Sequence, residues 1–345
     1  MMKKLSTILA VILSLLFVLA ACAPAAAPSA PADTAQQPEA AQGFKVGLLV
    51  SGPTNDSGWN AVAYQGLQAA IADLGVSGDC VENVSAQAQE EVLRNFANQG
   101  YDMIIAHGYE FNDAVTKVAK DFPNIKFVVT SSSVAVEPNL AALEVSNKEA
   151  GFIGGVLAGA FTETNKIAYI GGEEMPPITD AADGFVAGSR LVNEAVEPQD
   201  TLIGSWDDVA KAKEVAISYI ENGCDVVLGN ANQAGLGVIE GAKEKGKTAI
   251  GFAGDQAEVA PETVVASSKY DLSVGIKFVI NEALQGTFEA KYYLLATKEG
   301  ATGVLWNEAL KPSLDPAKVQ LVEDTIQAIV NGEIDVEALI AAVQR

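Results

Sequence analysis

The sequence alternates short, continuously apolar runs with segments of helical length over most of its 345 residues. The apolar runs carry Val, Ile, Leu and Ala on consecutive positions rather than on every second one. Such runs are typical of parallel strands covered on both faces, and their alternation with helices predicts a doubly wound α/β sheet. The predicted strands are Phe44–Val50, Cys80–Ser85, Met103–His107, Lys126–Ser131, Ala141–Ser146, Lys166–Gly171, Thr201–Trp206, Asp225–Gly229, Thr248–Ala253 and Thr263–Lys269.

Helices are predicted between these strands and after them. The pattern is long enough for two sheets, so we expect two doubly wound parallel-sheet lobes with a hinge. The predicted N-lobe covers residues 43–147 plus about 270–300, and the predicted C-lobe covers 148–269 plus about 301–345. The predicted helices are Trp59–Leu74, Gln87–Asn98, Asn112–Asp121, Gly151–Phe161, Asp208–Glu221, Ala234–Lys245, Asp271–Leu284, Pro316–Val330 and Val336–Val343, with one more strand at Tyr292–Thr297. The predicted hinge segments are Ser146–Lys148, Lys269–Asp271 and Thr297–Thr302.

The N-terminal residues have the layout of a secretory signal. Two lysines precede the apolar run Leu5–Leu19, and the small residues Ala20 and Ala21 precede Cys22. The run is shorter than the roughly 20 apolar residues that span a bilayer. Its end resembles a bacterial lipobox, which implies cleavage before Cys22 and a lipid on its sulfur. We therefore expect a signal peptide over residues 1–21 and an extracytoplasmic lipoprotein anchored to the cell membrane. Residues 22–42, rich in Ala and Pro, are predicted to be a lipid-anchored flexible tether.

Charge and residue usage exclude several classes of function. The formal net charge of −22 argues against nucleic acid as a partner. The sole histidine, His107, ends an apolar strand, and neither a nucleophile elbow nor metal-ligand spacing is present. We therefore predict that the chain is not an enzyme and has no catalytic residues, no metal and no cofactor. Cys80 and Cys224 are expected in different lobes as two buried free thiols.

Ligands of open parallel sheets bind beyond the carboxyl ends of the strands. Polar and aromatic residues follow the predicted strands in both lobes, which predicts a small-molecule site between them. Flat rings at Trp59 and Trp206 are placed to sandwich a flat ligand, and the Asn side chains offer donors and acceptors. The predicted ligand-binding residues are Asp56, Trp59, Asn60, Tyr109, Ser131, Trp206, Asn230, Asn232, Asp255 and Lys269.

Other roles are open for several of these residues. Each Trp can instead pack a helix on its own sheet, and Asp56 can cap the helix that begins at Trp59. Lys269 can pair with Asp255 or with Asp271. Trp306 lies outside the series of strand ends and is predicted to be structural.

A motif after the first predicted strand resembles the D-x-[SG]-[FW]-N element of the basic membrane protein family; it is Asn55-Asp56-Ser57-Gly58-Trp59-Asn60. The members of this family are bacterial nucleoside-binding lipoproteins of ABC importers. The resemblance continues in order over essentially the whole mature body. The further matching segments are Tyr101–Gly108, Phe122–Phe127, Lys148–Gly159, Gly235–Ile239 and Ile250–Gln256. It implies a type-I periplasmic binding protein fold, a purine-like ligand and an ABC permease as partner.

The resemblance also implies roles for individual residues. The family's aromatic clamp corresponds to Trp59 and Trp206, its Asn to Asn60, and its ribose-contacting Lys to Lys269. The sequence departs from the family at Ala253, where many members are acidic, at Asn232-Gln233-Ala234, which replaces Gly-Gly-Thr, and around Thr130 and Ser131, where an acidic residue is missing. A free nucleobase is therefore expected as much as a nucleoside. The alternative is a sugar-binding or ligand-sensing lipoprotein of the same fold.

Overall fold

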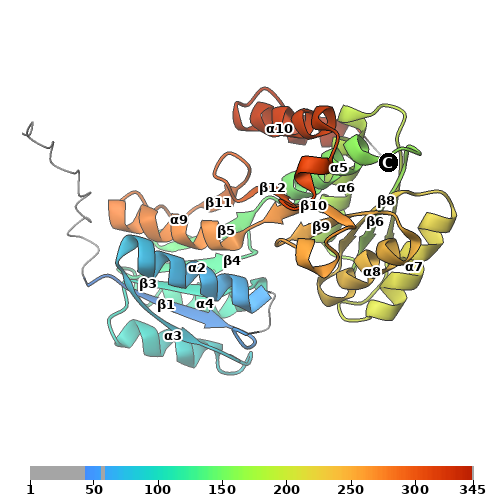
Figure 1. The fold of residues 1–345 in the computed structure, drawn as a ribbon. Helices are drawn as coiled ribbons and strands as arrows, with labels where there is room; N and C mark the ends of the chain where they lie inside the picture. Colours follow the sequence, from blue (N-terminus) through green and yellow to red (C-terminus); the bar gives the residue numbers. More distant parts are fainter. Residues whose placement is uncertain (1–42, 56–58, 344–345) are drawn as a thin grey trace, which may run out of the picture. The chain divides into compact units, whose positions relative to one another are not determined.

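Most of the continuous apolar runs form strands in two six-stranded sheets (Figure 1). In this computed structural model, residues 43–55 and 59–343 are described. The predicted signal peptide and tether, with Cys22, and also Asp56 lie outside the described residues. Among the residues that are described, no helix is both long and apolar enough to cross a membrane.

The first sheet is parallel throughout, with the strand order β11-β5-β4-β3-β1-β2. A strand from late in the chain thus completes a sheet that is built mainly from the first 145 residues. The strands are β1 (Lys45–Val50), β2 (Ser77–Val81), β3 (Met103–His107), β4 (Lys126–Thr130), β5 (Leu140–Val145) and β11 (Tyr292–Leu295).

Helices cover both faces of this sheet. The helices α2 (Trp59–Leu74) and α9 (Leu272–Gln285) lie side by side on one face (Figure 1), where Leu67 and Ile276 belong to one buried cluster. The helices α3 (Gln89–Asn98) and α4 (Asn112–Ala119) bury the other face through Leu93 and Val115. The short 3-10 helix η2 (Tyr109–Phe111) precedes α4. Because both faces are covered, the inner strands β1, β3, β4 and β5 are largely apolar on consecutive positions, as is typical of parallel strands.

The second sheet has the order β12-β10-β9-β8-β6-β7. Its neighbours pair in parallel except β12, which is antiparallel to β10. The strands are β6 (Lys166–Gly171), β7 (Glu197–Leu202), β8 (Val226–Asn230), β9 (Thr248–Ala253), β10 (Val264–Tyr270) and β12 (Thr302–Trp306).

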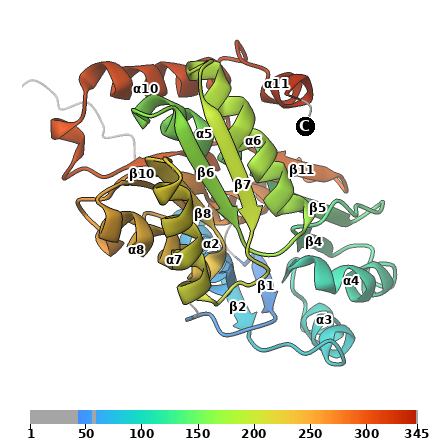
Figure 2. The same cartoon turned by 90° about the vertical axis from the view of Figure 1, so that its right-hand side faces the viewer.

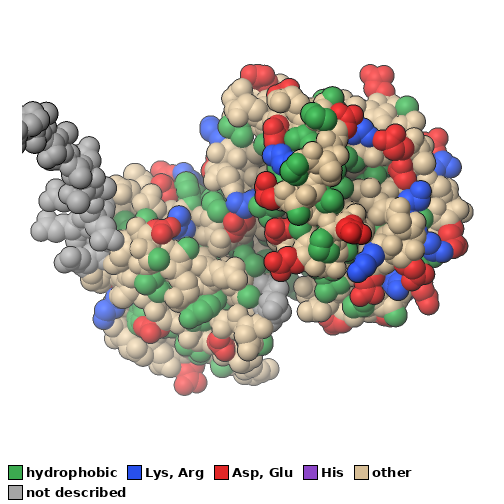
Figure 3. All heavy atoms as spheres, in the orientation of Figure 1, with side chains coloured by type: hydrophobic (Ala, Val, Ile, Leu, Met, Phe, Trp, Pro, Cys, Tyr) green, Lys and Arg blue, Asp and Glu red, His purple; other side chains and the backbone are tan. Residues whose placement is uncertain are grey.

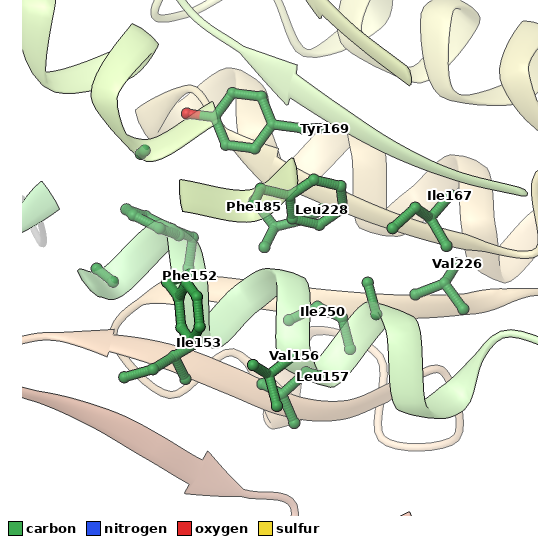
Figure 4. Packing of buried hydrophobic residues seen from close by; sticks show 14 of the residues in the cluster. Phe152, Ile153, Val156, Leu157, Ile167, Tyr169, Phe185, Val226, Leu228 and Ile250 are labelled. Carbon is green, nitrogen blue, oxygen red and sulfur yellow. The ribbon is translucent and has the colours of Figure 1, made fainter. Parts of the chain in front are cut away.

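The largest buried cluster lies on one face of this second sheet, under α5 (Asn147–Phe161) and α6 (Pro176–Val192). Figure 4 shows Phe152 of α5 and Phe185 of α6 together with strand side chains of this cluster. The helices α10 (Pro316–Val330) and α11 (Val336–Ala342) contribute to the same cluster, and Figure 2 shows them near α5 and α6. The opposite face is covered by α7 (Val209–Glu221) and α8 (Gly235–Lys245). Among the described residues, this part of the chain also has the 3-10 helices η3 (Asn232–Ala234), η4 (Ala257–Val259) and η5 (Lys311–Ser313).

The helices α5 and α6 pack backbone against backbone. A β-carbon added to Gly155 would lie 2.0 Å from the carbonyl oxygen of Phe185, and one added to Gly188 would lie 2.0 Å from that of Phe152. Glycine is required at these positions because the neighbouring atoms belong to the main chain, which cannot rotate away. The Gly- and Ala-rich helix α5 is accordingly buried from Ala150 to Ala160.

Two predicted strands are displaced, and one α-helix and one strand were not predicted. The strand predicted at Cys80–Ser85 is β2 at Ser77–Val81, and the one predicted at Thr201–Trp206 is β7 at Glu197–Leu202. Both are half-exposed edge strands, so neither carries a continuous apolar run. The helix α6 and the edge strand β12 are absent from the sequence-based assignment. A Pro pair at the start of α6 is typical of a helix N-terminus and was the available signal.

Candidate functional site

The carboxyl edge of the first sheet carries an exposed tryptophan. Trp59 is the first residue of α2 and follows the loop after β1. Its side chain is 36% exposed, and its indole stacks on the imidazole of His107 with ring centroids 4.2 Å apart and an angle of 30° between the planes. One face of the indole is therefore covered by the protein itself.

His107 ends β3 and is fully buried. Its Nε2 atom lies 2.9 Å from the carbonyl oxygen of Trp59, and its Nδ1 atom lies 2.8 Å from Oγ1 of Thr130. The backbone N–H of Gly108 donates to the same Thr130 oxygen at 3.1 Å. The single histidine thus joins β3, β4 and the start of α2, which is a supporting place rather than an exposed catalytic one.

The other predicted residues of this edge differ in their surroundings. The side chain of Asn60 is buried, and its Oδ1 accepts a hydrogen bond from the N–H of Gly52 at 3.3 Å. Tyr109, which follows β3, is 62% exposed. Ser131, which follows β4, has a positive φ of 51°. Because β1, β3 and β4 are neighbours, their carboxyl ends bring these side chains to one edge of the sheet.

Ser131 also contacts a residue from the second sheet. Its side chain and that of Asn147 hydrogen-bond the phenol of Tyr270, the last residue of β10. Burial raises the pKa of the Tyr270 phenol, the nearby Glu144 carboxylate adds to the rise, and the two hydrogen bonds oppose it. Ser131 therefore has a role in joining the chain segments between the sheets.

Trp206 lies beyond β7 rather than at its end. The indole is half-buried and lies over Gly172, at the carboxyl end of β6, where a β-carbon would come within 2.4 Å of the ring. The Trp206 carbonyl accepts a hydrogen bond from Ala234 at 2.8 Å. Trp206 thus packs partly against its own lobe, and like Trp59 it has one side of its ring covered by protein.

Three predicted polar residues follow neighbouring strands β8 and β9. Asn230 ends β8, and its Nδ2 donates to the hydroxyl of Tyr169 at 2.8 Å. Asn232 is exposed and has a φ of 50°, which places it in the left-handed region. Asp255 is exposed and accepts a hydrogen bond from the N–H of Ala257 at 2.9 Å. These side chains share the carboxyl edge of the second sheet.

Lys269 pairs with Asp271 rather than with Asp255. Its Nζ lies 3.2 Å from Oδ2 of Asp271 and 2.9 Å from the carbonyl oxygen of Gly300. Asp271 also caps α9 by accepting from the N–H of Ser273. The ammonium group is therefore already held by the chain segments that pass from one sheet to the other.

A carboxylate that sequence reasoning missed joins two of these passing segments. Oε2 of Glu149 accepts from the backbone N–H of Thr297 at 2.9 Å and from its hydroxyl at 2.6 Å. Glu149 is in the first turn of α5, whose N-cap is Ser146, and the Ser-x-x-Glu spacing was the available signal. In a typical capping box the Glu would turn back to the N-cap, but here the Ser146 N–H is bonded to Leu295.

The described residues form neither a metal site nor a disulfide. Within residues 43–55 and 59–343, no group of His, Cys, Asp or Glu side chains is arranged to hold a metal ion. Cys80 and Cys224 are both free; Cys224 is buried and Cys80 half-buried.

Figure 3 shows Asp and Glu side chains spread over the visible face, which is the pattern of a solvated surface. A groove lined by Val304, Trp306, Val322, Glu323, Ile326 and Gln327 contains none of the predicted ligand-binding residues.

The fold is that of the periplasmic solute-binding proteins. An ABC transporter solute-binding protein from Conexibacter woesei has the same architecture, with a TM-score of 0.70 at 22% identity over 85% of this chain and 98% of that one. The family model described as ABC transporter substrate-binding protein PnrA-like matches residues 44–339. The chain therefore belongs to the Bmp (basic membrane protein) family. This confirms the resemblance that the sequence motifs indicated.

Three curated relatives carry names from this family or its function. Basic membrane protein A1 of Borrelia garinii is 28% identical over 84% of this chain and 87% of that protein. The ABC transporter nucleoside-binding protein BmpA of Lactococcus lactis is 31% identical over 55% of each chain. A purine-binding protein of Brucella abortus is 25% identical over 85% of this chain and 82% of that one. The family model describes ABC transporter substrate-binding proteins, a class that works outside the cytoplasm with a small-molecule ligand and a permease.

Proposed function

We propose that this protein binds a purine nucleoside or nucleobase between its two lobes and delivers it to an ABC permease. The observation that carries the proposal is the exposed indole of Trp59, supported from behind by His107 at the carboxyl edge of the first sheet. A flat, half-exposed ring in this place suits a flat ligand, and aromatic stacking contributes about 0.5–1.5 kcal/mol beyond area burial. The name of the Lactococcus lactis relative supports a nucleoside, and the name of the Brucella abortus relative supports a purine.

Trp206 is the second half of the proposed clamp. It extends from the loop after β7, and Gly172 supports one side of its ring. A ligand that stacks on Trp59 would meet Trp206 when the lobes close, so the contacts made only in the closed form would shift the open–closed equilibrium. The lobes in this proposal are residues 43–147 plus about 270–300, and 148–269 plus about 301–345.

Polar side chains of the second sheet are proposed to select the ligand. The Nδ2 of Asn230 is engaged by Tyr169, which leaves its Oδ1 to accept from a purine N–H. Asn232 and Asp255 are exposed beside it. A good hydrogen bond contributes about 1 kcal/mol, whereas a buried group left unpaired costs about 1–3 kcal/mol. Mismatched ligands are therefore rejected mainly by these groups, whereas affinity comes mainly from stacking.

The ammonium group of Lys269, the residue proposed to contact ribose, already has partners within the protein. A ribose hydroxyl would compete with Asp271 and the Gly300 carbonyl for Nζ of Lys269. At the neighbouring strand β9 the residue opposite Lys269 is Ala253, which has no carboxylate for a hydroxyl. These two features support a nucleobase as strongly as a nucleoside.

The anchor belongs to the proposal as well. We infer that the chain is cleaved before Cys22, lipidated there and held at the outer side of a cell membrane by residues 22–42. Cys22→Ala should abolish the incorporation of labelled fatty acid into the protein in the producing cells. Labelling of that variant at wild-type levels would overturn the lipid anchor and leave the ligand proposal standing.

The test of the ligand is a titration of the full-length protein in detergent with adenosine, guanosine, inosine, adenine, guanine and ribose, followed by Trp fluorescence and by calorimetry. Binding of a purine that is lost in Trp59→Ala and in Trp206→Ala is the expected result. Trp306→Phe is the matched control, because Trp306 packs against Phe161 and Lys311 away from the site. A response to ribose alone would overturn the purine and favour the sugar-binding alternative.

A further inference from the structure

We propose that His107 is a positioning residue of the ligand site, whose imidazole holds the Trp59 indole in the orientation that receives the ligand. The inference rests on the proposed function, because it assigns a support to the first ring of the clamp. It concerns a buried side chain that cannot itself touch a ligand, since His107 has no exposed surface. Its effect must therefore pass through Trp59.

The orientation of the imidazole is fixed by its hydrogen bonds. A carbonyl oxygen can only accept, so Nε2 of His107 carries the proton that it donates to the Trp59 carbonyl at 2.9 Å. In the neutral ring, Nδ1 then accepts the hydroxyl proton of Thr130 at 2.8 Å. The Thr130 oxygen in turn receives the N–H of Gly108. The ring is thus held at both nitrogens, from two different elements.

This fixed ring lies directly beneath the indole. A centroid separation of 4.2 Å at 30° is a stacked contact, and it covers one face of Trp59. The indole is 36% exposed and belongs to the first residue of a helix. Without a flat group behind it the side chain would sample more rotamers before binding, and the ligand would have to select one of them.

The histidine makes two separable contributions to Trp59. The ring supplies the stacking surface, and the Nε2 proton ties the start of α2 to the end of β3. We assign the orientation of the indole to the stacking surface. His107→Phe keeps a flat ring and loses both hydrogen bonds, whereas His107→Gln keeps an N–H donor and loses the ring. His107→Ala loses both.

The first readout needs no ligand. The sequence has three tryptophans, so Trp206→Phe with Trp306→Phe leaves Trp59 as the only one. In this full-length protein we expect His107→Ala and His107→Gln to lower the near-UV circular dichroism of Trp59 and to raise its acrylamide quenching. His107→Phe should restore most of both signals. The matched control is Val129→Ala, a buried change in β4 beside Thr130 on the face covered by α3 and α4.

The second readout is affinity, measured in the protein with all three tryptophans. For whichever of adenosine, guanosine, adenine or guanine binds the wild type, His107→Ala and His107→Gln should weaken binding by about 3- to 10-fold, the range expected when one large side chain must be ordered on binding. His107→Phe should recover most of that loss.

The outcomes separate this inference from the proposed function. Wild-type Trp59 signals in His107→Ala, or equal changes in Val129→Ala, would overturn the positioning role, as would recovery by Gln instead of Phe. If the wild type binds no purine, the proposed function fails, and the Trp59 signals still decide the positioning role. If the Phe variant does not fold, His107→Ala measured against Val129→Ala decides it.

Discussion

The six-membered ring of Trp206 lies over the α-carbon of Gly172. A β-carbon at Gly172 would come within 2.4 Å of Cζ3 and 2.5 Å of Cε3 of the indole. Such distances are far below an ordinary van der Waals contact, so any side chain at this position must displace the ring. The φ of Gly172 is not in the left-handed region, so glycine is required here for space alone.

The first prediction follows from that contact. Gly172→Ala should push the Trp206 indole off the end of β6, because the ring is the movable partner. We expect about 10-fold weaker binding of the purine that binds the wild type, with little loss of stability, since one stacking surface is misplaced by more than an ångström. Calorimetric titration and thermal unfolding measure the two effects.

Gly254→Ala is the control for this variant, because no atom beyond the two neighbouring residues in the chain lies within 4 Å of a β-carbon there. It should bind and unfold like the wild type. Wild-type affinity in Gly172→Ala would mean that Trp206 does not contact the ligand from its observed position.

The sequence predicted the central strands to within a residue because burial on both faces leaves a continuous apolar run. The strands β3, β6 and β9 have the predicted bounds. The edge strands β2 and β7 are half-exposed, so their polar sequences did not stand out and the apolar residues beyond them were chosen instead. That error placed Trp206 at a strand end when it lies in the following loop.

The residues at the strand ends were predictable from topology, whereas their partners were not. Which side chains follow the parallel strands is fixed by the order of elements along the chain. For Lys269 the sequence left Asp255 and Asp271 open as partners, whereas the position of His107 beneath Trp59 depends on rotamers and on a contact between distant segments. No local pattern in the sequence carries that information.

The second prediction concerns the core of the second lobe. Gly155→Ala places a methyl group 2.0 Å from the carbonyl oxygen of Phe185, so α5 and α6 must move apart. Overpacking of this kind lowers the free energy of unfolding by about 1–3 kcal/mol. We expect a loss at the upper end of this range, because the neighbouring atom belongs to the main chain. Denaturant unfolding followed by circular dichroism gives the value. A midpoint equal to that of Gly254→Ala would show that the two helices separate at no cost.

The third prediction is that both described thiols react slowly in the native protein. Burial, with a smaller effect of Glu82, raises the pKa of Cys80 to about 12. Burial, with a smaller effect of Asp225, raises that of Cys224 to about 11. The thiolate fraction at pH 8 is then about 10⁻⁴ and 10⁻³, compared with roughly a quarter for an unperturbed thiol.

The measurement is the reaction with a chromogenic disulfide at pH 8, using full-length Cys22→Ser protein. We expect the folded protein to react at least about 100-fold more slowly than a free thiol such as glutathione. After unfolding, both thiols of each chain should react rapidly. Rapid modification of either cysteine before unfolding would contradict the assigned burial.

The last prediction is a pH dependence of stability that arises from Asp180 on α6. Burial raises the pKa of this carboxyl; Lys148 opposes the rise, and Asp183 and Glu337 add to it. The folded state therefore holds the proton more tightly than the unfolded chain does, so this group lowers stability as pH rises through its folded pKa.

Asp180→Asn removes the ionisation and should raise the melting temperature at pH 7. The expected rise is at most about 2 °C, because solvent screens the charge of a half-exposed group. The gain should be smaller at pH 4, because the wild-type carboxyl takes up its proton as the pH falls. Asp207→Asn, at an exposed position, is the matched control and should leave the melting temperature unchanged at both pH values. A lower melting temperature for Asp180→Asn at pH 7 would mean that the attraction to Lys148 outweighs burial.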